Sequence, residues 1–110
     1  MTGINQVESS PLVLDLDGDG NTDMVFGDYD GDVHFIDYMG NEKLGFPVNV
    51  GDDIWGAPAS ADLDLDGDLE IIVASKGGTL NIISLLGDFL NNELLLVIAW
   101  FMNKIKIFIL

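Results

Sequence analysis

The 110-residue sequence contains no cysteine and only four basic side chains. The absence of cysteine excludes disulfide bonds and thiolate metal sites, and it is compatible with any redox compartment. All nineteen acidic residues lie within residues 1–93, where only Lys43 and Lys76 oppose them. This segment therefore has a charge of −17, and the tail from Leu94 onward has +2. Such an acidic chain repels phosphate backbones and attracts divalent cations, so we expect no nucleic-acid partner.

Two further features are missing from the sequence. Residues 1–10 have neither the basic nor the apolar region of a secretory signal, so we expect either an intracellular protein or a piece of a longer chain. No segment before Phe89 shows helical periodicity over ten residues. Hydrophobic residues make up 48% of the chain, which is too many for a disordered acidic polypeptide. A folded all-β protein is therefore expected.

The sequence does contain an internal repeat of 47 residues. Residues 9–43 align without a gap on residues 56–90, and acidic, glycine and apolar positions stay in phase throughout. We therefore divide the chain into a lead-in (1–8), a first blade-like repeat (9–50), a second blade-like repeat (51–93) and an apolar tail (94–110).

Each repeat shows the pattern of about four short strands. Apolar runs flank the dipeptides Asp30-Gly31 and Gly77-Gly78, and these tight-turn signals predict a β-hairpin in each repeat. A period in the forties with four strands per unit is typical of a β-propeller blade. Propellers have roughly four to eight blades, and each blade needs neighbours to cover its faces. We expect about two four-stranded antiparallel blades of an incomplete propeller, completed by the rest of a longer chain or by self-association.

Two segments place acidic residues at alternate positions: DLDGDGNTD at residues 15–23 and DLDLDGDLE at residues 62–70. The spacing resembles the first nine positions of a calcium loop, in which alternate oxygens converge on one ion. Gly20 and Gly67, at position six, allow the bend. Position seven contributes its backbone carbonyl. The predicted ligands are Asp15, Asp17, Asp19, Asn21 and Asp23 in the first loop, and Asp62, Asp64, Asp66, Asp68 and Glu70 in the second.

The sequences around the loops exclude an EF-hand. Position twelve is Phe26 or Val73, each within a predicted strand, whereas an EF-hand has a bidentate glutamate there and flanking helices. Magnesium is less suitable, because it prefers few carboxylates and keeps its waters. The alternative is a solvated acidic turn that binds nothing. We favour two structural Ca²⁺ sites, because the pattern occurs twice with its glycine in register.

Other conspicuous residues are interpreted as structural. Residues 28–32 are acidic, but their repeat partners 75–79 contain no acid, so a hairpin turn is favoured over a third cation loop. His34 has no second imidazole nearby in sequence, which predicts a surface or packing histidine. Trp55 is expected to pack between blades. No catalytic triad order, phosphate-binding loop or zinc spacing occurs, so no catalytic residue is predicted and the chain is not expected to be an enzyme.

Residues 9–90 resemble the FG-GAP family of β-propeller repeats, which is also seen in integrin α-subunit propellers and bacterial VCBS-type surface proteins. The resemblance rests on three segments: Trp55-Gly56-Ala57-Pro58, the second acidic loop with the following Ile71-Ile72-Val73, and Gly45-Phe46-Pro47-Val48. The resemblance implies calcium in the loop between the first two strands of each blade, a secreted or cell-surface setting, and a role in adhesion or ligand display. Two features depart from the family: Glu8-Ser9-Ser10-Pro11 replaces the Trp-Gly element in the first repeat, and residues after Asn91 match nothing in it.

The tail, residues 94–110, is apolar at fourteen of seventeen positions. It is shorter than the roughly twenty residues of a spanning helix, and Asn103, Lys104 and Lys106 interrupt it. Three interpretations stay open: a membrane anchor, an outer strand at 93–102 with a further strand at 105–110, or a non-native sequence from a shifted reading frame.

The leading functional hypothesis is a non-enzymatic, calcium-binding propeller segment of a secreted or cell-surface adhesion or scaffold protein. Its expected partners are calcium, neighbouring blades and a protein or glycan ligand. One alternative is the non-catalytic propeller part of a secreted enzyme, either polysaccharide-active or a quinoprotein. Another is a surface protein anchored by the tail. The extracellular setting is consistent with calcium, because extracellular modules bind it at about 0.1–1 mM, which cytosolic calcium never reaches.

Overall fold

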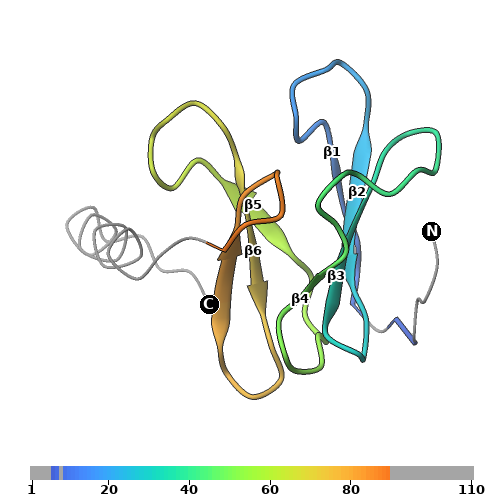
Figure 1. Cartoon of the computed structure of the whole chain (residues 1–110), viewed down its shortest axis with the longest axis vertical. Coiled ribbons are helices and arrows are strands. Elements are labelled where there is room, and N and C mark those ends of the chain that lie inside the picture. Colours follow the sequence, from blue (N-terminus) through green and yellow to red (C-terminus); the bar gives the residue numbers. More distant parts are fainter. Residues whose placement is uncertain (1–5, 8, 90–110) are drawn as a thin grey trace.

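The computed structural model describes residues 6–7 and 9–89, which form two antiparallel β-sheets (Figure 1). Both sheets follow chain order, so each strand pairs with the next one in sequence. The first sheet contains β1 (Leu12–Leu14), β2 (Asp23–Gly27), β3 (Asp32–Ile36) and β4 (Val48–Asn49). The second contains β5 (Ala59–Ala61), β6 (Glu70–Ala74) and β7 (Leu80–Ile83). The described residues contain no helix, so the all-β prediction is confirmed.

The strands repeat with the spacing seen in the sequence. β5 and β6 begin and end 47 residues after β1 and β2, and β7 ends 47 residues after β3. The register repeats as well, because Val25 lies opposite Phe35 in the first sheet and Ile72 lies opposite Ile82 in the second. The hydrophobic pattern and the turns therefore select the same strand pairing twice.

The second sheet has three strands where four were expected. A bridge between Ile83 and Phe89 continues this sheet, as the bridge between Ile36 and Glu42 does in the first. The predicted outer strand at 93–102, and the other interpretations of the tail, lie outside the described residues. The two sheets do not close into a ring, so the structure supports two antiparallel sheets and not yet propeller blades. Within residues 6–7 and 9–89, no helix is long and apolar enough to cross a membrane.

One hydrophobic core joins the two sheets. Side chains alternate along each strand, so Val25 and Phe35 of the first sheet face Ile71 and Ile83 of the second, and all four are completely buried. Ile54, from the connector between the sheets, completes this core. Burying side chains of this size stabilises the fold by about 1.5–3 kcal/mol each. The two sheets lie side by side (Figure 1) and share this core.

The connector between the sheets is hydrogen-bonded to both hairpin turns. The N–H groups of Val50 and Ile54 donate to carbonyls of the β2–β3 turn, and the N–H of Lys76 in the β6–β7 turn donates to the Asp53 carbonyl. These bonds fix the position of one sheet relative to the other.

Trp55 lies between the two turns. Its ring stacks on Tyr29 of the β2–β3 turn at 5.7 Å, and the Lys76 ammonium of the β6–β7 turn lies 4.4 Å from its centroid. The tryptophan therefore packs between the sheets, as expected, while half of its surface stays exposed.

The two acidic loops lie at the same end of the molecule. They connect β1 to β2 and β5 to β6, and both are at the top of Figure 1, whereas the two hairpin turns are at the bottom. This placement follows from the repeated topology, because equivalent antiparallel connections emerge at the same sheet end.

Candidate metal centre

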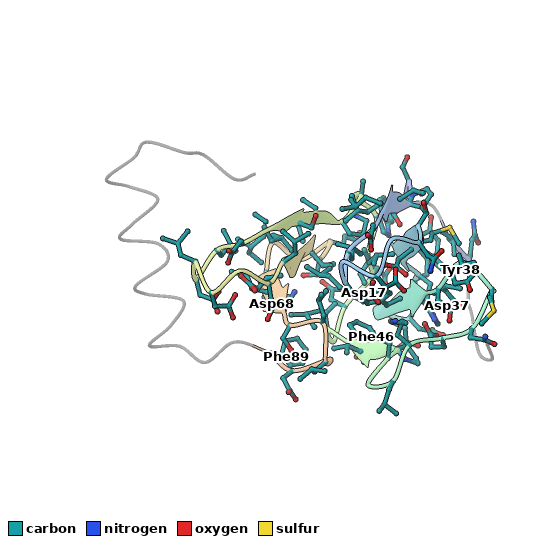
Figure 2. The ribbon with its side chains drawn as sticks, turned by 90° about the horizontal axis from the view of Figure 1, so that it is seen from above. Asp17, Asp37, Tyr38, Phe46, Asp68 and Phe89 are labelled. Atoms are coloured by element: carbon teal, nitrogen blue, oxygen red, sulfur yellow. The ribbon has the colours of Figure 1, made fainter. Side chains whose placement is uncertain are left out.

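The acidic side chains of each loop converge on one point. Each residue of a cluster offers one carboxylate oxygen, and these oxygens all lie within 4.8 Å of one another. Figure 2 shows the molecule from the loop end, with Asp17 labelled on the first loop and Asp68 on the second. The clusters are Asp15, Asp17, Asp19 and Asp23 in the first loop, and Asp62, Asp64, Asp66 and Glu70 in the second. These are the eight side-chain ligands predicted from the sequence.

The two remaining predicted ligands are backbone carbonyls, and they stay predictions. Their residues, Asn21 and Asp68, lie in the loops, where their N–H groups donate to Asp19 Oδ1 at 2.8 Å and to Asp66 Oδ1 at 2.9 Å. These bonds orient the carboxylates at position five.

Backbone amides also fix the carboxylate at position one. Asp15 accepts hydrogen bonds from the N–H of Asp19 (3.2 Å) and of Gly20 (2.9 Å). The same bonds recur 47 residues later at Asp62, with lengths of 3.2 and 2.9 Å. The glycine at position six has a φ of +88° in the first loop and +95° in the second. Only glycine adopts this left-handed conformation without strain, which explains its place in the motif.

A buried acid closes each loop. Asp23 and Glu70 are the first residues of β2 and β6 and are 1% and 3% exposed. Each carboxylate accepts a hydrogen bond from the loop backbone, Asp23 from the Leu16 N–H at 3.0 Å and Glu70 from the Leu63 N–H at 2.7 Å. Burial raises the pKa of both carboxyls, because a charge removed from water is costly.

One atom of the first cluster shows that a cation would fit. Among the described residues, Asp23 Oδ1 is a buried oxygen without a hydrogen-bond partner. A buried acceptor left unpaired costs about 1–3 kcal/mol, and more when it is charged. A cation held by the four carboxylates would supply the missing partner. Hard oxygen donors of this kind and number suit a hard divalent ion such as calcium.

Residues 15–73, more than half of the chain, match the model of the FG-GAP-like repeat. The chain belongs to the FG-GAP-like repeat family. The match begins at the first ligand of the first loop and ends within β6, so it includes both acidic loops. The family resemblance seen in the sequence is confirmed. No curated protein matches this FG-GAP-like chain.

The two loops of this FG-GAP-like protein differ in one contact. Lys43 Nζ lies 2.7 Å from Asp17 Oδ2 of the first loop, and this hydrogen-bonded ion pair lowers the pKa of Asp17 and raises that of Lys43. In the second loop, burial raises the pKa of the equivalent Asp64, and the neighbouring Asp66 adds to the effect. The described residues contain no basic partner for the second loop. No pattern in the sequence predicted the Lys43 contact, which joins residues 26 apart.

A third group of side chains with metal-binding chemistry lies beside the β2–β3 turn of the FG-GAP-like fold. Asp28, Asp32 and His34 each place one ligand atom within 4.8 Å of the others. His34 is completely buried; its Nε2 lies 3.2 Å from Asp28 Oδ2, and its Nδ1 lies 2.7 Å from Glu42 Oε1. The surface interpretation of His34 is therefore wrong, and the packing interpretation is correct. Its two carboxylate partners, Asp28 and Glu42, were not predicted from the sequence.

The turn itself agrees with the hairpin interpretation. Asp28 Oδ1 accepts hydrogen bonds from the N–H groups of Asp30 and Asp32, both at 3.0 Å, and Gly31 has a φ of +84°. Asp28, Asp30 and Asp32 alternate as the acids of the two loops do, but here the Asp28 carboxylate supports a tight turn between two strands.

Proposed function

We propose that this FG-GAP-like segment binds two Ca²⁺ ions, one in each acidic loop, and that the ions stabilise propeller blades of a secreted or cell-surface adhesion or scaffold protein. The observation that carries the proposal is the convergence of four carboxylates in each loop, with the buried Asp23 Oδ1 left unpaired by the protein. The role is structural and non-enzymatic.

The loop geometry explains why the chain needs a cation. Two unit charges 4 Å apart repel by about 1 kcal/mol even in bulk water, and each cluster contains several such pairs. Bound calcium supplies two positive charges and accepts six to eight oxygens. The loop backbone holds the carboxylates in position through the amide bonds to Asp15 and Asp62. Since Asp23 and Glu70 begin β2 and β6, their ligation fixes the point where each of these strands begins.

The outer face of the first sheet has an apolar surface on which a further blade could pack. Met24 and Phe26 lie on the face turned away from the core and, with residues of the N-terminal segment, they line a shallow apolar hollow. The lining residues are Val7, Ser9, Pro11, Met24 and Phe26. Apolar surface of this kind is covered by a neighbouring unit in stacked repeats. Neighbouring blades, from a longer chain or a second copy, are the partners proposed here, and the adhesion ligand is a protein or a glycan.

The proposed secreted or cell-surface setting rests on the calcium affinity expected of extracellular modules. Exposed loops of extracellular modules bind calcium at about 0.1–1 mM, which matches extracellular and not cytosolic calcium. Asp19 and Asp66 are exposed, so ions in the solvent have access to both loops.

Calcium titration tests the proposal. The full 110-residue chain is stripped with chelator, and CaCl₂ is added during calorimetry and in parallel thermal melts. We expect two bound ions, and a rise in the free energy of unfolding of about 2.7 kcal/mol per site when calcium reaches about a hundred times its Kd. MgCl₂ at equal concentration should give a smaller rise. No calcium heat and no change in melting would refute the function.

A further inference from the structure

Lys43 gives the first loop a cation of its own. Its ammonium lies 2.7 Å from Asp17 Oδ2, and the two side chains are 30% and 23% exposed. The Lys43 N–H donates to the Phe35 carbonyl at 2.7 Å, and Nζ lies 5.6 Å from the Phe35 ring centroid. The stem of the lysine is therefore held against β3, and its head is directed at a predicted ligand of the loop.

Within the part of the chain that the structure describes, the second loop has no such cation. The 47-residue repeat places Leu90 at the position equivalent to Lys43. The described ion pairs include none with the second cluster, and the other described lysine, Lys76, lies over the Trp55 ring at the opposite end of the sheets. Among residues 6–7 and 9–89, the first cluster thus has one positive charge in direct contact, and the second has none.

We propose that Lys43 is an intramolecular competitor for the divalent ion at the first loop, so that the two loops bind calcium with unequal affinity and fill in order, the second before the first. The inference rests on the proposed calcium function. A divalent ion in the first loop must either displace the ammonium from Asp17 or bind beside it. Both routes weaken binding, because the first breaks an ion pair and the second places like charges close together.

Affinity at the first loop alone tests this proposal. The double substitution Asp64→Asn and Asp66→Asn removes two carboxylate ligands of the second loop, outside the core, and should abolish calcium binding there. In this background, Lys43→Met should tighten calcium binding about tenfold by calorimetry, the size expected when a unit charge at contact distance from a divalent ion is removed from a solvent-exposed site. Lys43→Gln repeats the test with a polar side chain should the Met variant fail to fold.

Two matched variants control for charge. Lys76→Met makes the same change in net charge at the opposite end of the molecule, and it should alter the affinity less than about twofold. Lys43→Arg keeps the competing charge and should stay within about threefold of the parent. Equal effects of Lys43→Met and Lys76→Met, or weaker binding in Lys43→Met, would overturn the inference.

The result also separates this inference from the proposed function. Absence of calcium heat in the unmodified chain overturns both. Two calcium ions bound with equal affinity, and no change with Lys43→Met, overturn only the role of Lys43.

Discussion

Replacing Asp23 by asparagine should stabilise the chelated chain and weaken its response to calcium. The carboxylate is 1% exposed, and Oδ1 has no hydrogen-bond partner among the described residues. In Asp23→Asn, the side-chain oxygen can keep the bond from the Leu16 N–H, and the new amide N–H₂ can donate to a carboxylate of the same cluster. An unpaired buried acceptor thereby becomes a paired donor.

The size of the expected stability change follows from replacing the unpaired carboxylate oxygen by an amide N–H₂. Removing an unpaired buried acceptor should raise the free energy of unfolding in chelator by about 1–2 kcal/mol, or roughly 4–16 °C in melting temperature for a domain of this size. In calcium, the loop has one formal charge fewer. A tenfold loss of affinity then reduces the calcium-dependent stabilisation at that site by up to about 1.4 kcal/mol, the limit reached at saturating calcium. The variant should therefore gain stability without the ion and lose part of what the ion provides.

Urea unfolding at neutral pH, in chelator and in millimolar CaCl₂, measures both effects. The matched control is Asp37→Asn, which makes the same chemical change at a turn whose carboxylate accepts the N–H groups of Met39 and Asn41. This control should not be stabilised in chelator, and its calcium response should be unchanged. Should Asp23→Asn be less stable than the parent in chelator, the carboxylate has a partner that the cation argument does not include, and the reasoning fails.

Three further predictions concern packing, the buried histidine and pH. Gly27→Ala should lower the free energy of unfolding in urea by about 1–3 kcal/mol, because the new methyl group would lie 2.6 Å from the Ile54 Cβ. The control Gly56→Ala, whose methyl group enters open space, should change stability by less than about 0.5 kcal/mol. Equal effects of the two substitutions would contradict the packing of Ile54 against Gly27. His34→Phe should cost about 1–3 kcal/mol by the same measurement, because it removes the contacts of the buried imidazole with the carboxylates of Asp28 and Glu42, and a loss below about 0.5 kcal/mol would speak against those contacts. In chelator, lowering the pH from neutral toward about 5 should raise the melting temperature. The reason is that Asp23 and Glu70 have raised pKa values in the folded chain, so the folded chain binds protons above the unfolded-state pKa range of about 3.9–4.3. Calcium should abolish this gain, and a melting temperature that falls in chelator would contradict the prediction.

Local features of this fold were predictable from sequence. The strands recur at the 47-residue spacing because the same short hydrophobic runs and turn glycines occur twice, and each run pairs with its neighbour in the chain. The convergence of Asp15, Asp17 and Asp19 was predictable for a similar reason. A nine-residue loop with a left-handed glycine at position six brings alternate side chains together through its own amide bonds.

Contacts between distant segments were not predictable. His34 is buried between Asp28 and Glu42, yet the sequence showed only an isolated imidazole on a strand. Ile54 fills the space above Gly27, although nothing in the connector marked it as a core residue. Strand alternation assigns a side chain to one of two faces, but it does not say which residues of another segment will cover that face.

The sequence by itself determined the all-β class, the repeat and the chemistry of two oxygen-rich loops, because these depend on interactions within about ten residues of chain. The tertiary structure decided that the two loops are not equivalent. Lys43 reaches Asp17 across 26 residues only because the segment after β3 returns along that strand and places the lysine against Phe35. The burial of Asp23 Oδ1 without a hydrogen-bond partner is likewise seen only in the folded chain. Charge placement over such distances is a property of the packed chain, and no local pattern in this sequence encodes it.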